Sequence, residues 1–138
     1  MKTLSELAFS RWEGKSELWE DPLGNVAQES DCTIAIDDGV VTYRWSYQGK
    51  PHEGNLKLGA GDVVFSDTWH QQEPIACEVV PGGRAIATVQ YTYMQEWGWR
   101  IHLCHRDPTG ELVLQMTNIA PWGEEARAVR MVCKRALG

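Results

Sequence analysis

The sequence predicts an all-β protein: a single antiparallel up-and-down β-barrel of about ten strands, with at most a short N-terminal helix. Two observations support this fold class. Turn signals punctuate the chain, among them "DPLGN", "DDG", "PGG" and "DPTG". The segments between them are short and alternate apolar with polar residues, which is the period of a half-buried strand. The expected strands lie near residues 11–20, 26–36, 40–48, 53–58, 62–69, 76–80, 84–94, 98–106, 111–118 and 126–135.

The alternation favours a barrel because one face of each predicted strand is apolar and the other is polar. In "VVTYRWSYQ" the apolar face carries Val41, Tyr43, Trp45 and Tyr47. The same pattern recurs in residues 84–94, 98–106 and 111–118. Consecutive hairpins with one polar face throughout indicate a closed meander, since closure also removes the exposed edges of the sheet.

The only helix candidate is a segment of one or two turns near residues 5–10, for which Thr3 or Ser5 could serve as the N-cap. The length of 138 residues suits one domain with one core, so we expect residues 1–138 to form a single barrel domain. The sequence contains no internal repeat and no linker-like segment.

Composition and charge argue against several classes of partner. The net charge is −6 and no long basic run is present, so nucleic acid is not an expected partner. No apolar run approaches the roughly 20 residues of a membrane span. The start "MKTLSELAFSRWEGK" has no signal-peptide core, which predicts a cytoplasmic protein. Seven Trp against two Phe favour a semi-polar pocket, because an indole N–H needs a partner.

The four cysteines, Cys32, Cys77, Cys104 and Cys133, are widely spaced and form no C-x-x-C pair. We expect them to serve as small buried hydrophobic side chains. The spacing that is typical of a structural zinc site is absent, so no metal is predicted. No G-x-S-x-G motif or glycine-rich phosphate loop is present either.

The segment "FSRWEGKSELWEDP" resembles the first strand of the calycins, the group of lipocalins and fatty-acid-binding proteins. Members of that group open with a Trp and a Gly and close with a basic residue that packs over the Trp. The resemblance implies these roles for Trp12 and Gly14, and for Arg130 or Arg135. The indole would then plug one end of the barrel while a guanidinium stacks on its face. The tail "LQMTNIAPWGEEARAVRMVCKR" also resembles an uncharacterised bacterial family of lipocalin-like domains.

A ligand-binding cavity is predicted from the inward-facing side chains. The expected lining residues are Tyr43, Trp45, Tyr47, Phe65, Asp67, Trp69, Tyr91, Tyr93, Trp99, His105 and Met116. Apolar walls with a few polar groups are typical of small-molecule pockets. Asp67 shares the apolar face of "DVVFSDTWH", and a buried carboxylate needs partners. Two interpretations stay open for Asp67: a ligand anchor or general base, and a structural pairing with an Arg or Tyr.

The histidines give little indication of a metal or haem site. His102 and His105 lie three residues apart on a strand and point to opposite faces, so they cannot chelate one metal together. We expect no cofactor, but haem ligation by an inward-facing His105 is an alternative that the related haem-binding barrels imply. His52 and His70 lie at strand ends or loops, where exposure is expected.

The predicted function is binding of one small, largely apolar or aromatic molecule in the barrel. An apolar ligand with one basic or hydroxyl group would suit these walls, because aromatic faces attract cations. The alternative is an enzyme of isomerase, cyclase or decarboxylase type, using Asp67, His105 and Tyr hydroxyls for acid–base steps. A filled barrel that acts through its surface or as a homodimer also stays open.

Overall fold

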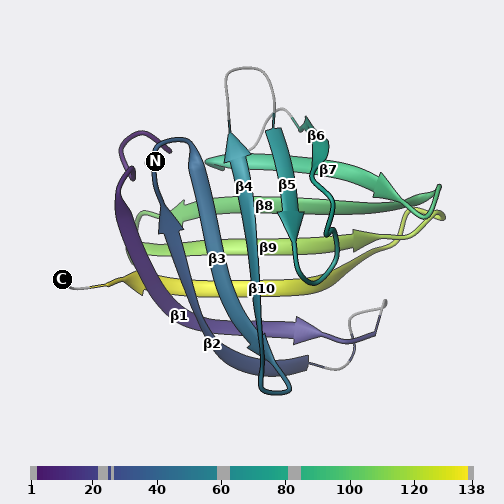
Figure 1. Cartoon of the computed structure of the whole chain (residues 1–138), viewed down its shortest axis with the longest axis horizontal. Coiled ribbons are helices and arrows are strands. Elements are labelled where there is room, and N and C mark those ends of the chain that lie inside the picture. The colour runs from purple at the N-terminus through teal and green to yellow at the C-terminus, as the bar shows by residue number, and fades with distance from the viewer. Residues whose placement is uncertain (1–2, 22–24, 26, 59–62, 81–84, 137–138) are drawn as a thin grey trace.

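The computed structural model describes residues 3–21, 25, 27–58, 63–80 and 85–136. These described residues form ten antiparallel strands that close into one barrel (Figure 1). The strands are β1 (Ser10–Trp19), β2 (Ala27–Ile36), β3 (Val40–Tyr47), β4 (Lys50–Leu58), β5 (Val63–Asp67), β6 (Ile75–Val79), β7 (Ala87–Tyr93), β8 (Trp97–Arg106), β9 (Glu111–Ile119) and β10 (Glu125–Arg135).

Each strand pairs with the next one along the chain, and β1 also pairs with β10 to close the sheet. The predicted all-β fold class is therefore confirmed, and the topology fits a calycin-like fold in general. The alternating pattern predicted the strands because one face of each packs inward. Residues 26, 62 and 84, where three predicted strands begin, lie outside the described residues.

The helix candidate near residues 5–10 is not a helix in the structure, because residues 4–9 form a series of turns. Thr3 still acts as a cap: its hydroxyl accepts from the Glu6 N–H at 3.3 Å, and the Glu6 carboxylate accepts from the Thr3 N–H at 3.3 Å. The turns end at Phe9, whose φ of 60° redirects the chain into β1. A segment this short has too few internal hydrogen bonds to hold a regular helix on its own.

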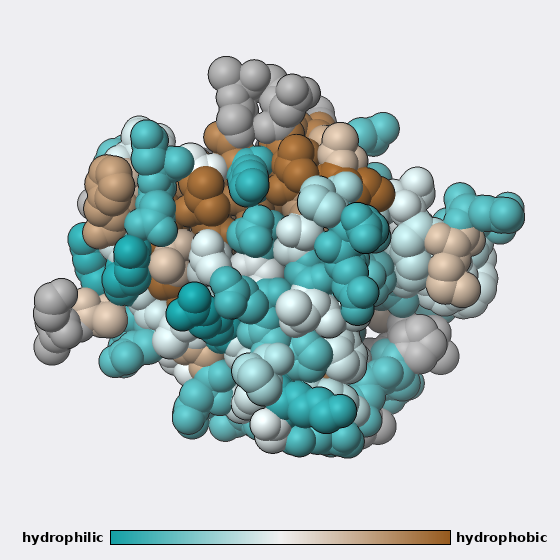
Figure 2. All heavy atoms as spheres, in the orientation of Figure 1, coloured by the Kyte–Doolittle hydropathy of each residue, from teal (hydrophilic) through white to brown (hydrophobic). Residues whose placement is uncertain are grey.

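The interior of the barrel is mostly filled by side chains. The largest fully buried residues are Tyr43, Phe65, Leu7, Ile34, Ile36, Leu56, Ile101, Leu103, Leu112, Leu114, Met116 and Met131. The outer surface in the view of Figure 2 is largely hydrophilic, and hydrophobic residues gather along its upper edge, over the ends of β4, β5 and β6. No described helix is long and apolar enough to cross a membrane.

The two ends of the barrel differ. One end holds the start of β1 and the ends of β8 and β10 (Figure 1). The other end holds the end of β1, the segment after β5, the β7–β8 hairpin and the β9–β10 connection. We refer to these as the plugged end and the barrel mouth.

Candidate functional site

A small cavity lies at the barrel mouth, with a volume of about 160 Å³. A cavity of about 150 Å³ is large enough to hold one benzene-sized molecule. We call it the mouth cavity; its lining residues are Trp19, Glu20, Asp21, Trp69, His70, Tyr93, Trp99, Asn118 and Ala128. It combines aromatic walls with a few polar groups, which is typical of ligand sites.

A larger hollow, of about 430 Å³, lies over β4 and β5 and is a weaker candidate. The residues around it are Glu53, Asn55, Ser66, Asp67, Thr68 and Gln72. All of these side chains are polar, so the hollow has no aromatic wall, whereas three Trp and one Tyr line the mouth cavity. The mouth cavity is therefore the better candidate despite its smaller volume.

Asp67 fixes the segment that carries two walls of the mouth cavity. Its Oδ1 accepts hydrogen bonds from the backbone N–H groups of Trp69 at 3.2 Å, His70 at 2.6 Å and Gln71 at 2.7 Å. Its Oδ2 accepts from the hydroxyl of Tyr43 at 2.9 Å. This is the structural interpretation of Asp67, a buried carboxylate paired with a tyrosine. Direct contact between Asp67 and a ligand stays a prediction.

Tyr43 is held as a hydrogen-bond donor to Asp67. Burial of the ring, with the nearby charge of Asp67, raises the pKa of Tyr43 well above its usual value. Gly54 makes room for the ring, because a Cβ there would lie 2.3 Å from the Tyr43 hydroxyl oxygen. The buried pair is therefore built from three neighbouring strands, β3, β4 and β5.

His70 is half-buried at the mouth cavity, so the expectation that it is exposed is wrong. Its ring stacks on Trp99, with centroids 3.7 Å apart and planes at 13°. Its Nδ1 lies 2.5 Å from the hydroxyl of Tyr91, and the edge of Tyr93 packs against it at 4.4 Å. Burial lowers the pKa of His70 to about 4, although the charge of Asp67 opposes this. The imidazole is therefore neutral at pH 7.

This lowered pKa predicts an acid-sensitive fold. Between about pH 4 and the ordinary value of 6.5, the unfolded chain binds more protons at His70 than the folded chain does. The free energy of unfolding should therefore rise with pH across this window and fall on acidification. Urea midpoints measured at several pH values should show a weaker dependence in His70→Phe, which keeps a ring on Trp99. Equal slopes in both proteins would contradict the assignment.

Three further aromatic rings pack against Trp69. Its ring lies 5.4 Å from Trp45, 5.0 Å from Tyr47 and 5.3 Å from His52, measured between centroids. His52 also stacks on Trp45 at 4.8 Å. Desolvation, and then the interaction with Glu20, raise the pKa of Tyr47. Trp45 and Tyr47 thus support a wall of the cavity from behind.

Trp99 contributes an unused hydrogen-bond donor. The side chain is 3% exposed, and its Nε1 has no hydrogen-bond partner among the described residues. The neighbouring Tyr93 hydroxyl, in contrast, donates to Oδ1 of Asn118. A buried N–H without a partner costs about 1–3 kcal/mol.

The mouth cavity has charged groups of both signs nearby, and its charged lining residues are acidic. Glu20 and Asp21 are both lining residues. Asp21 is also tied to the chain beyond it, because its carboxylate accepts from the N–H of Asn25 at 2.8 Å. The guanidinium of Arg127 lies 4.5 Å from the centroid of Trp19, which shows that this indole already takes a cation on one face.

The predicted lining set is only partly brought together. Trp69, Tyr93 and Trp99 line the mouth cavity. Trp45, Tyr47 and Tyr91 stand behind its walls. Tyr43, Phe65 and Met116 are at most 1% exposed and pack in the core. The expectation of one cavity lined by all of these side chains is wrong, because the barrel interior is filled.

His105 lies at the plugged end, far from the predicted cavity. Its ring packs edge-on against Trp12 at 6.0 Å, and its Nδ1 lies 2.9 Å from Asp107. Trp99 and His105 are six residues apart on β8, which places them about 20 Å from each other along the strand. His105 therefore does not share a site with Asp67 or with the mouth cavity.

Trp12 closes the plugged end. It is 2% exposed, and its Nε1 donates to the hydroxyl of Ser10 at 2.8 Å. The guanidinium of Arg135 lies 5.9 Å from the Trp12 centroid, on the neighbouring strand β10. Arg130 is placed five residues further along β10, opposite Glu17. Of the two predicted arginines, the structure therefore puts Arg135 beside the indole.

No protein-family model matches the chain, and no curated protein matches its sequence. The agreement with a calycin-like fold therefore rests on the barrel topology.

Proposed function

We propose that this chain is a lipocalin-like binding protein for a small, largely apolar or aromatic molecule that carries one basic group. The observation that carries the proposal is the mouth cavity: Trp19, Trp69 and Trp99 surround a space for about one ring, with carboxylates beside it. We thus place the ligand at the barrel mouth and not deep in the interior, where the sequence predicted it.

The chemistry of the walls supports a cationic ligand. Aromatic faces attract cations by about 0.5–1 kcal/mol when exposed and about 2 kcal/mol when desolvated. Glu20 and Asp21 add negative charge at the same cavity.

The cavity walls are preorganised, which lowers the cost of binding. Asp67 holds Trp69 and His70 through their backbone N–H groups. Tyr91 and Trp99 then fix the His70 ring. The alternative enzyme function drew on Asp67, His105 and Tyr hydroxyls, but His105 packs against Trp12 at the plugged end, away from Asp67.

Titration of Trp fluorescence with three matched probes tests the proposal. The probes are 2-phenylethylamine, 2-phenylethanol and phenylacetate, which share a ring and differ in charge. We expect the amine to bind most tightly, with at least a roughly tenfold advantage over phenylacetate, equivalent to about 1.4 kcal/mol. The advantage should shrink at high salt because the carboxylates are partly exposed.

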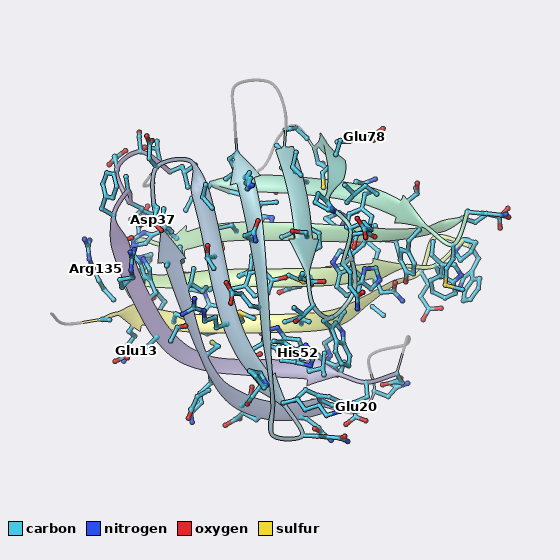
Figure 3. The ribbon with its side chains drawn as sticks, viewed as in Figure 1. Glu13, Glu20, Asp37, His52, Glu78 and Arg135 are labelled. Atoms are coloured by element: carbon cyan, nitrogen blue, oxygen red, sulfur yellow. The ribbon has the colours of Figure 1, made fainter. Side chains whose placement is uncertain are left out.

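Matched variants locate the site. Trp69→Leu should weaken amine binding about tenfold or more, whereas Trp122→Leu should not, because Trp122 is 66% exposed and is not a lining residue. Glu20→Gln should reduce the preference for the amine, and Glu13→Gln should leave it unchanged. Figure 3 shows Glu20 and Glu13 toward opposite ends of the barrel. Equal affinity for all three probes, or equal effects in each pair, would refute the proposal.

A further inference from the structure

Two cysteines from different strands meet inside the barrel. Cys32 on β2 and Cys133 on β10 are 101 residues apart in sequence, and their sulfurs lie 3.5 Å from each other. Both are free thiols, 3% and 0% exposed. The two strands are not neighbours, because β1 runs between them and its Gly14 pairs with both cysteines.

Gly14 makes this approach possible. A Cβ at this position would lie 2.0 Å from the carbonyl oxygen of Val132 and 2.8 Å from the Cα of Cys133. No side chain could occupy that space without displacing backbone. The glycine thus lets β10 lie close to β1 while the two thiols meet across it.

We propose that Cys32 and Cys133 form a latent disulfide, a redox modification site that links β2 to β10 across β1. A disulfide has its sulfurs about 2.05 Å apart, so the thiols must approach by about 1.5 Å. The link would join the first and last parts of the chain at the seam where the barrel closes. It is independent of the proposed ligand.

A peroxide supplies the oxidant in a balanced reaction. The thiolate of one cysteine attacks a peroxide oxygen, which breaks the O–O bond and yields a sulfenic acid and water. The second thiol then attacks that sulfur, forms the S–S bond and releases a second water. Two thiols and one hydrogen peroxide thus give one disulfide and two waters, and a dithiol reductant reverses the result.

The two thiols share one hydrogen bond in which either sulfur can be the donor, so either cysteine can be the first to react with the oxidant. Both sulfurs are buried, so the oxidant reaches them through transient opening of the seam. Cys77 and Cys104 are only half-buried, and both must be removed from the experiment.

The test uses the full chain with Cys77→Ser and Cys104→Ser, treated with hydrogen peroxide under native conditions. Intact mass should fall by two hydrogens, and peptide mapping should join the Cys32 and Cys133 peptides. The melting temperature should rise and return after dithiothreitol, because the link closes a long loop in the unfolded chain. The further variant Cys133→Ser should show neither change.

Three results would overturn the proposal. The first is addition of oxygen to the sulfurs without a cross-link. The second is a disulfide that forms only after denaturant has unfolded the chain. The third is a linked protein that melts at the same or a lower temperature. Peptide mapping of the unmodified chain after the same treatment gives the answer if the serine variants do not fold.

Discussion

Trp12→Ala should lower the free energy of unfolding by about 3–5 kcal/mol, the range for truncation of a buried aromatic side chain. The indole is 2% exposed and closes the plugged end, where Arg135, His105 and Ser10 contact it. Removal leaves a cavity that the rigid barrel end cannot collapse to fill. Urea unfolding followed by circular dichroism measures this loss.

The matched control is Trp122→Ala. Trp122 is 66% exposed, so its truncation should change the free energy of unfolding by no more than about 0.5 kcal/mol. A loss below about 1 kcal/mol for Trp12→Ala would show that the indole is peripheral to the fold. Similar losses in the two variants would lead to the same conclusion.

Asp67→Ala should have the second-largest effect, a loss of about 3 kcal/mol, because it removes one acceptor group that serves four hydrogen bonds. The buried hydroxyl of Tyr43 then loses Asp67 as its hydrogen-bond acceptor in the core. Asp67→Asn keeps an acceptor oxygen and should lose less. Asp31→Ala is the control, since the side chain of Asp31 is 85% exposed and its ion pair with Lys15 contributes little.

Asp67→Ala should also weaken ligand binding at the mouth cavity. Without the carboxylate, the N–H groups of Trp69 and His70 lose their acceptor, so both rings become more mobile at the mouth cavity. Affinity for 2-phenylethylamine should therefore fall in Asp67→Ala and stay near the original value in Asp31→Ala. Unchanged affinity in a folded Asp67→Ala protein would show that the segment needs no such anchor.

The fold could be predicted because local alternation and turn residues determine it. Each strand has its own alternating pattern. In a meander each strand pairs with the next one along the chain, so the pairing follows from the order of the strands. The N-terminal segment was predicted less well. Thr3, one of the two predicted caps, exchanges hydrogen bonds with Glu6. The helix does not follow, because Phe9 turns the chain into β1 too soon.

The candidate site could be predicted only in part, because alternation gives the face of a strand and not the position along the barrel axis. Trp99 and His105 share a face of β8, yet they reach opposite ends of the barrel. His70 and Glu20 were missed because they follow strands, where alternation ceases. Their positions depend on partners distant in sequence, such as Trp99 for His70.

The most direct test of the mouth cavity is a ¹H–¹⁵N spectrum of the seven indole N–H groups during titration with 2-phenylethylamine. Assignment by single Trp→Phe variants identifies each signal. The account predicts progressive shifts for Trp19, Trp69 and Trp99, which line the cavity, and stationary signals for Trp12 and Trp122. Shifts confined to Trp12 or Trp122, or no shift at saturating amine, would contradict it.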